Sequence, residues 1–170
     1  MNRRFFLKSG MVLGALAVLP NSAHAFSPVD PSRRKKTDPP LAKINRSDEE
    51  WKRILTPEQY RVTRRAGTEA PFSSPLNDEH GRGIFECVGC ELPLFDSRTK
   101  FNSHTGWPSF YAPISKRNVR ERTDDSLGER RTEVLCARCD AHLGHVFDDG
   151  PAPTGLRYCM NGVALKFVKK

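Results

Sequence analysis

The sequence of 170 residues lacks an apolar run long enough to cross a bilayer. The clearest candidate, Met11 to Leu19, is shorter than the roughly 20 residues that a membrane-spanning helix needs. The sequence also lacks an internal repeat of a whole supersecondary unit, and it has only five cysteines. These absences argue against a permanent membrane anchor and a repeat array, and the length suits one domain.

A stripe of basic and aromatic residues on one element, which would indicate nucleic-acid binding, is also missing. The net charge is +8, but the basic cluster Arg33 to Lys36 lies in a stretch rich in proline and serine and is expected to be a solvated tether. Removal of the first 25 residues would take away three of the positive charges and leave +5 over 145 residues. We therefore expect no nucleic-acid partner.

The first 25 residues have the layout of an export signal. A charged start that includes Arg3 and Arg4 precedes the short apolar run, which is followed by Pro20 and by small residues ending at Ala25. The paired arginines resemble the twin-arginine type, whose export machinery carries folded proteins. We expect cleavage after residue 25 and a periplasmic location; an ordinary export signal or a retained anchor are the alternatives.

Residues 26–43 lack apolar periodicity and are predicted to form a flexible linker, so the folded domain is expected to span 44–170. Ser47 and Thr56 each begin a capping box, which predicts two short helices, and Trp51, Ile54 and Leu55 give the first helix one buried stripe. Beyond Gly83 short strands alternate with tight loops. This pattern indicates a mainly β, antiparallel architecture.

Four of the five cysteines form two CxxC pairs separated by 45 residues: Cys87 with Cys90, and Cys136 with Cys139. Four thiolates complete a tetrahedral zinc site and leave no open position for a substrate, so we predict one structural Zn²⁺. Two redox-active pairs or an iron site also fit the spacing, and zinc is favoured over both. Metal loaded before export would protect these thiols from an oxidising compartment.

Cys159 is the one thiol that the predicted metal leaves free. If residues 156–161 form a strand, Arg157, Cys159 and Asn161 project from one face, and a nearby cation increases the thiolate fraction of a cysteine. His142 and His145 lie upstream across a segment with turn chemistry. The same residues also fit a buried core thiol with structural histidines.

Three segments carry a resemblance to a known family: HLGHVFDDGPAPTGLRYCMN at 142–161, TGWPSF at 105–110, and ERRTEVLCARCDAHLGHVF at 129–147. They are similar to the C-terminal signature, the tryptophan loop and the second zinc pair of the B-type methionine sulfoxide reductases. The resemblance covers about residues 47–168, with the motifs in the same order. It implies two small antiparallel sheets, short N-terminal helices and a pair of loops clamped by zinc.

The resemblance also implies a chemistry. Cys159 attacks the sulfur of the R epimer of methionine sulfoxide and becomes a sulfenic acid, while His145 donates a hydrogen bond or proton to the oxygen. His142 and Asn161 orient the reacting group. Trp107 presents its ring to the substrate's methyl group, with Phe110 in the same pocket; filling of the core is the alternative for both aromatic residues.

One position departs from the family pattern. Many relatives carry a second, resolving cysteine where this chain has Thr105. Since the other four cysteines are assigned to zinc, we expect a thioredoxin-like protein or a small thiol to reduce Cys159 directly. We expect a monomer that acts on oxidised methionine in proteins. A zinc-clamped binding module and a thiol peroxidase that uses Cys159 are the competing hypotheses.

Overall fold

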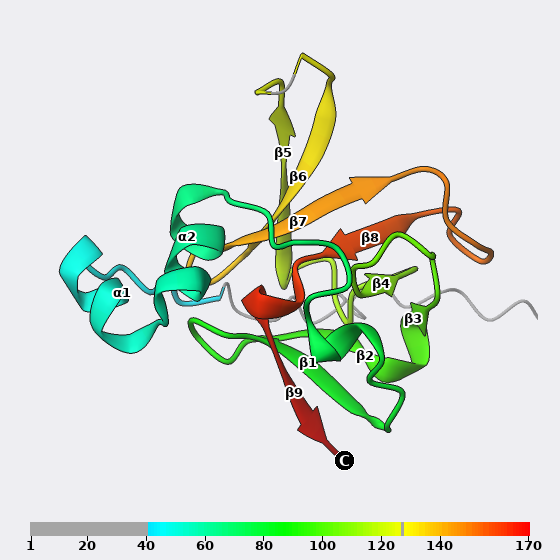
Figure 1. Cartoon of the computed structure of the whole chain (residues 1–170), viewed down its shortest axis with the longest axis horizontal. Coiled ribbons are helices and arrows are strands. Elements are labelled where there is room, and N and C mark those ends of the chain that lie inside the picture. The colour runs from blue at the N-terminus through cyan, green and yellow to red at the C-terminus, as the bar shows by residue number, and fades with distance from the viewer. Residues whose placement is uncertain (1–40, 127) are drawn as a thin grey trace, which may run out of the picture. The chain divides into compact units, whose positions relative to one another are not determined.

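The computed structural model describes residues 41–126 and 128–170 (Figure 1). The expected export signal, 1–25, and residues 26–40 of the expected linker lie outside these ranges. Within them, none of the helices combines the length and the apolar character that crossing a membrane requires.

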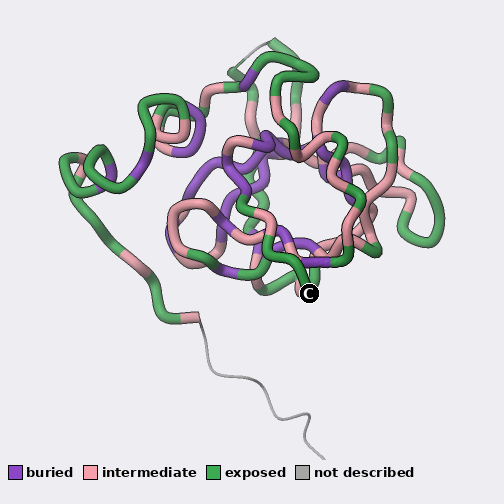
Figure 2. Tube along the Cα trace, turned by 60° about the horizontal axis from the view of Figure 1, so that its bottom comes forward, coloured by how far each residue is buried: buried purple, intermediate pink, exposed green. Residues whose placement is uncertain are grey.

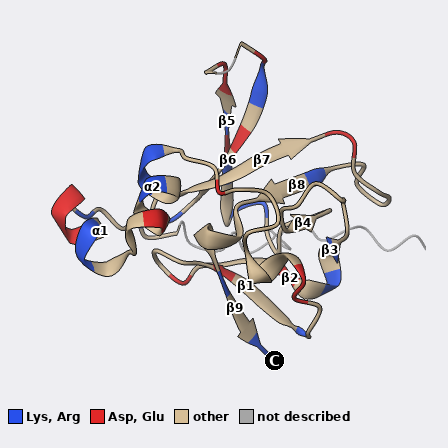
Figure 3. Ribbon diagram, viewed as in Figure 1, with Lys and Arg blue, Asp and Glu red and all other residues tan. Residues whose placement is uncertain are grey.

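Two short helices open the described part: α1 (Asp48–Ile54) and α2 (Pro57–Arg65). Each begins with the predicted capping box. The side chain of Ser47 or Thr56 accepts a hydrogen bond from the backbone N–H of Glu50 or Gln59, and the side chain of Glu50 or Gln59 accepts one from the backbone N–H of Ser47 or Thr56. Acidic residues gather at the start of α1 and basic ones in the last turn of both helices (Figure 3), as the helix dipole favours. The local sequence alone therefore accounts for both helices.

The helices pack through Trp51 and Leu55, which are 3% and 7% exposed. The expected third member of that stripe, Ile54, is 52% exposed, because its side chain lies off the face that Trp51 and Leu55 share four residues apart. Arg64 lies over the Trp51 ring, 4.7 Å from the centroid, and donates a 2.8 Å hydrogen bond to the carbonyl of Cys139. Helix α2 is thereby attached to the second CxxC loop.

The strands form two antiparallel sheets, as predicted. The smaller sheet has the order β2-β1-β9, with bounds Pro93–Asp96, Gly83–Cys87 and Leu165–Lys169. The larger has the order β3-β4-β8-β7-β6-β5, with bounds Lys100–Phe101, Ser109–Phe110, Arg157–Met160, His142–Phe147, Arg131–Cys136 and Val119–Asp124. Short 3-10 turns lie at Pro75–Asn77, Ser97–Thr99 and Gly162–Ala164.

Aromatic rings from both sheets meet in the core. Phe110 on β4 stacks on Phe95 of β2, with centroids 4.5 Å apart, and meets Phe85 of β1 edge to face at 4.9 Å. Tyr158 of β8 pairs with Phe110 across the strands and also contacts Phe95. All four rings are at most 2% exposed, and Figure 2 shows buried segments concentrated in the interior of the domain. Burial of each such ring contributes about 1.5–3 kcal/mol.

A buried carboxylate joins the loop after α2 to the end of the chain. Glu69, 3% exposed, accepts hydrogen bonds from the backbone N–H groups of Gly162 and Val163 at 2.6 and 2.8 Å. Asn161, which precedes this 3-10 turn, gives it no side-chain cap, so Glu69 caps the turn from far away in the sequence. Burial raises the pKa of the Glu69 carboxyl, and the two N–H donors act in the opposite direction.

We predict that Glu69→Gln lowers the free energy of unfolding by about 1–3 kcal/mol, because the new amide NH₂ cannot accept from one of the two buried N–H groups. Urea unfolding measures this change. Glu58→Gln is the matched control: Glu58 is 58% exposed and pairs with Arg61 at 3.7 Å, so its loss should cost less than about 1 kcal/mol. Equal effects of the two substitutions would contradict the capping role.

Candidate active site and metal centre

One row of residues crosses five strands of the larger sheet. Ser109, Cys159, His145, Glu133 and Arg122 are successive cross-strand partners on β4, β8, β7, β6 and β5. Direct cross-strand partners share a face and have Cβ atoms about 4.5–5.5 Å apart. Cys159 therefore lies between Ser109 and His145, on the face opposite the aromatic core.

The alternation predicted for residues 156–161 holds over β8. Tyr158 and Met160 are buried, while Arg157 and Cys159 are half-buried on the other face. Arg157 forms two 2.8 Å hydrogen bonds with the Asp149 carboxylate, and this ion pair, followed by the charge of Cys159, raises the pKa of Arg157. The predicted cation therefore lies beside the thiol, already paired with an anion.

A bulge in β7 brings both histidines to the site. They are three residues apart, so a regular strand would direct them to opposite faces. The register of β6 and β7 shifts between Val134 and Leu135, which pairs Leu135 with His142 instead of Leu143. The two imidazole rings consequently lie with centroids 5.5 Å apart.

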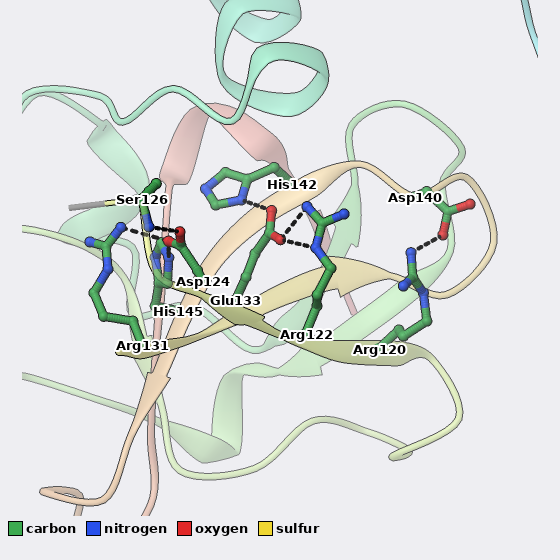
Figure 4. A network of polar contacts seen from close by, with 9 residues as sticks. All are labelled: Arg120, Arg122, Asp124, Ser126, Arg131, Glu133, Asp140, His142 and His145. Carbon is green, nitrogen blue, oxygen red and sulfur yellow. Dashed lines mark hydrogen bonds and ion pairs between the residues drawn. The ribbon is translucent and has the colours of Figure 1, made fainter. Parts of the chain in front are cut away.

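His142 is held by a buried carboxylate. Its Nδ1 lies 2.7 Å from Oε1 of Glu133, and Arg122 pairs with Oε2 of the same carboxylate at 2.6 Å (Figure 4). Burial lowers the pKa of His142, and Glu133 offsets part of this effect. Nδ1 of the neutral ring thus donates to Glu133. Nε2 is then an acceptor, and it is buried without a hydrogen-bond partner in the described residues.

His145 has a carboxylate partner of its own from β5. Its Nε2 lies 2.7 Å from Oδ2 of Asp124, an oxygen that also pairs with Arg131 at 2.7 Å (Figure 4). Hydrogen bonds from Ser126, then from His145 and Arg131, hold the pKa of the Asp124 carboxyl well below its usual range. Asp124 is consequently an anion at neutral pH and accepts the Nε2 hydrogen.

Asn161 joins segments that surround the pocket. Its Oδ1 accepts from the backbone N–H of Glu69 at 3.0 Å, and its Nδ2 donates to the Leu143 carbonyl at 3.1 Å. The Glu69 carbonyl in turn accepts from Nε1 of Trp107 at 3.2 Å. The backbone of Glu69 therefore fixes the amide of Asn161 and the indole ring of Trp107 at the same time.

A pocket opens beside Cys159. Its walls are formed by Thr68, Trp107, Arg131, Gly144, His145, Phe147, Cys159 and Asn161. Phe110, expected here, lies instead in the core against Phe95, because Ser109 faces the site and the next residue along a strand faces away. Phe147 takes that place, with the Arg157 guanidinium 4.4 Å from its ring centroid.

Three carboxylates of this site escaped the sequence interpretation: Asp124, Glu133 and Glu69. Glu133, Asp124 and Glu69 bind His142, His145 and Val163, which lie 9, 21 and 94 residues away in the sequence. Neither Asp124 nor Glu69 stands in one of the family-like segments. One signal was available for Glu133, which lies in the family-like segment 129–147, three residues before the second CxxC pair.

Thr105 stands at the position expected to differ from relatives. Its Oγ1 lies 3.8 Å from Sγ of Cys159, within hydrogen-bonding range for sulfur. A hydroxyl thus occupies the place beside Cys159 where many relatives are expected to carry a second thiol.

The four predicted metal ligands come together. All four Sγ atoms lie within 4.8 Å of one another; Cys87 and Cys139 are 3.6 Å apart, and Cys90 and Cys136 are 3.5 Å apart. Thiolates at the corners of a tetrahedron with metal–sulfur bonds of about 2.3 Å would be about 3.8 Å apart, so the donor set fits one zinc-sized ion.

The two CxxC loops have the same local geometry. The residue after each second cysteine, Glu91 or Asp140, has a positive φ of 55° or 56°, and its N–H bonds to the carbonyl of the first cysteine of its pair. The loops follow β1 and β6, so the cluster joins the smaller sheet to the larger one. At the second loop, Lys43 pairs with Asp140 at 2.8 Å.

Comparisons with known proteins show the family to which the chain belongs. The SelR domain model matches residues 55–169. The peptide methionine sulfoxide reductase MsrB of Pseudomonas putida (strain GB-1) is 59% identical over 125 residues, which cover 74% of this chain and 95% of that protein. MsrB of Pseudomonas fluorescens (strain Pf0-1) is 55% identical over 130 residues, 76% of this chain and 99% of the relative. The chain therefore belongs to the SelR domain family, the B-type methionine sulfoxide reductases.

Proposed function

We propose that the chain reduces the R epimer of methionine sulfoxide in oxidised proteins, with Cys159 as the nucleophile. One observation carries the proposal: Cys159 and His145 are direct cross-strand partners that line one pocket with Trp107. The pocket joins a thiol, a proton donor and an apolar wall, which are the three groups that this reaction needs. The preference for the R epimer rests on membership of the family.

The reaction moves one oxygen atom and two electrons. The Cys159 thiolate attacks the sulfoxide sulfur and forms a sulfur–sulfur bond while the oxygen takes up one proton. The hydroxyl then moves to the Cys159 sulfur as the sulfur–oxygen bond and the new sulfur–sulfur bond break, which releases methionine and leaves Cys159 as a sulfenic acid. Methionine sulfur is reduced by two electrons and cysteine sulfur is oxidised by two. Two external thiols then reduce the sulfenic acid, which gives one disulfide, one water and the free thiol.

His145 is our candidate for the proton donor. A sulfoxide oxygen can only accept hydrogen bonds, and in a protonated imidazole both nitrogens donate. Nε2 of His145 is held by Asp124, so Nδ1 is the nitrogen that serves the substrate. His142, neutral and bonded to Glu133 through Nδ1, offers only an acceptor at Nε2. We assign it to binding a water or the protonated product oxygen.

Trp107 and Phe147 supply the apolar wall for the methyl group, since an aromatic face buries a methyl favourably. Asn161 is engaged with the backbone at both ends of its amide. We therefore assign Asn161 to positioning the pocket, through Glu69 and the Trp107 ring, instead of direct contact with the oxygen.

We expect the mature protein to turn over only the R epimer of a blocked methionine sulfoxide with dithiothreitol as reductant, and Cys159→Ser to lose all turnover. Chiral chromatography of the remaining substrate measures both. Turnover of the S epimer, or activity in Cys159→Ser, would contradict the proposal. Rapid consumption of hydrogen peroxide without any sulfoxide turnover would favour a thiol peroxidase.

The same experiment tests how Cys159 is restored. The chain holds five cysteines, and four are assigned to metal, so we propose direct reduction by a thioredoxin-like protein or a small thiol. After substrate without reductant, the intact protein should gain one oxygen and form no internal disulfide. Thr105→Cys is the positive control, because a thiol at that position lies beside Cys159 and should trap the sulfenic acid as a disulfide.

We propose that the four-cysteine cluster holds one structural Zn²⁺. Four buried thiols at tetrahedral spacing support this assignment, since four sulfur ligands favour zinc or iron and leave no open position for catalysis. Bound zinc would join the two sheets at the ends of β1 and β6. Structural zinc contributes on the order of 10 kcal/mol to the folding of small modules.

We predict that Cys136→Ser lowers the zinc content and the melting temperature together. Loss of one thiolate opens the tetrahedron and weakens the link between the sheets. Atomic emission for zinc and calorimetry for melting measure the two quantities on the same sample. A variant with one zinc per chain and the wild-type melting temperature would contradict the assignment.

We also propose that the protein works in the periplasm after export by a twin-arginine-type signal. The support is the order of Arg3 and Arg4, a short apolar run and the small residues ending at Ala25. A folded, zinc-loaded precursor would keep its four metal ligands protected in an oxidising compartment. Recovery of the protein from the periplasmic fraction with residue 26 as its first residue tests both points; retention in the cytoplasm would contradict them.

A further inference from the structure

Four hydrogen-bonded groups lead away from the sulfur of Cys159. Its Sγ lies 3.8 Å from the Thr105 hydroxyl, which lies 2.8 Å from the Ser103 hydroxyl. Ser103 lies 2.7 Å from the Ser109 hydroxyl, which donates to the backbone carbonyl of Trp107 at 3.2 Å. We call Thr105, Ser103 and Ser109 the hydroxyl chain.

A count of hydrogens fixes the direction of the hydroxyl chain. Each hydroxyl has one hydrogen to donate and can accept as well. If Ser109 donates to the Trp107 carbonyl, Ser103 must donate to Ser109, and Thr105 must donate to Ser103. The sulfur of Cys159 then faces the acceptor side of Thr105, which suits a thiol that donates its S–H.

The opposite direction suits a thiolate. If Thr105 donates to the sulfur, Ser103 donates to Thr105 and Ser109 donates to Ser103. Every bond between neighbours in the hydroxyl chain is kept, and only the bond from Ser109 to the Trp107 carbonyl is released. Hydrogen bonds to charged acceptors are stronger than neutral ones, so the gain at the sulfur exceeds the loss at the carbonyl.

We propose that the hydroxyl chain reverses direction with the protonation state of Cys159, and that Thr105 is the donor that stabilises its thiolate. This inference deepens the proposed function, because it names the group that supports the nucleophile. The Ser109 hydroxyl is buried, at 1% exposure for the residue, which keeps this end of the chain from exchanging its partner for water.

Charged groups also face the sulfur, and each is already paired. On β8, Arg157 bonds to Asp149 through two hydrogen bonds. From β7, His145 bonds to Asp124, and Arg131 of β6 lines the pocket while paired with the same carboxylate. Arg157 also interacts with Cys159 through its charge and a hydrogen bond. The hydroxyl chain differs from these groups because Thr105 donates to the sulfur without bringing a charge or a counter-ion.

Alkylation of Cys159 by iodoacetamide tests the inference, because the thiolate is the species that reacts. The rate is measured across pH on the full, zinc-loaded chain by mass spectrometry of the peptide that contains Cys159. Thr105→Val should move the midpoint of the profile up by about one pH unit, which is a tenfold lower rate at a fixed pH below the midpoint. Ser103→Ala should give a smaller shift in the same direction.

Two further variants distinguish the effect of the Thr105 hydroxyl from the effect of side-chain shape. Thr105→Ser keeps a hydroxyl and should keep the wild-type midpoint. Thr123→Val is the matched control, since Thr123 is exposed on β5 and faces away from the site, and it should leave the profile unchanged. If circular dichroism shows that Thr105→Val does not fold, Ser103→Ala tests the inference instead: an upward shift of its alkylation midpoint supports the inference, and an unchanged midpoint overturns it.

A wild-type alkylation profile in folded Thr105→Val would overturn the inference, and so would equal shifts in Thr105→Val and Thr105→Ser. Failure of the proposed function is distinguishable, because it appears as absent sulfoxide turnover in the wild-type chain while the alkylation profile still reports on the hydroxyl chain. Where both hold, kcat/KM of Thr105→Val should fall tenfold at the same fixed pH, and Thr105→Ser should restore it.

Discussion

The register between β7 and β8 is the constraint on which the site depends. It places His145 directly opposite Cys159. A slip of one residue would move the Cys159 side chain to the other face of the sheet, toward the aromatic core. Gly144 allows this pairing: its φ is 155°, and a Cβ there would collide with the Cys159 carbonyl. Only glycine avoids that collision, so the close approach of the two strands is part of what positions Cys159.

The four-cysteine cluster constrains the same register from the other end of β7. Cys139 is followed after two residues by His142, and the N–H of Cys136 bonds to the carbonyl of Ala141. The second loop thus fixes where β7 begins, and the bulge that follows turns His142 to the face of His145. A metal with no chemical part in the reaction would still set the positions of both imidazoles.

Much of the fold could be predicted from local sequence, because capping boxes, CxxC pairs and alternation depend on neighbouring residues. The partners of the histidines could not be predicted, since Asp124 and Glu133 reach them only through the pairing of β5, β6 and β7. Phe110 shows the same limit. Its motif indicates a pocket, but its face is set by the pairing of Ser109 with Cys159, which directs Phe110 into the core.

Electrostatics around the sulfur gives the hydroxyl chain its importance. Arg157 is bound by Asp149 and also interacts with Cys159, so its charge is shared between the carboxylate and the sulfur. Asp124 likewise pairs with Arg131 and accepts a hydrogen bond from His145. A site built from paired charges stays close to neutral, which avoids the cost of isolated buried ions. Neutral donors such as the Thr105 hydroxyl can then favour the thiolate without attracting a further anion. A second thiol there could form a disulfide with Cys159, whereas the Thr105 hydroxyl can only donate to the sulfur or accept from it.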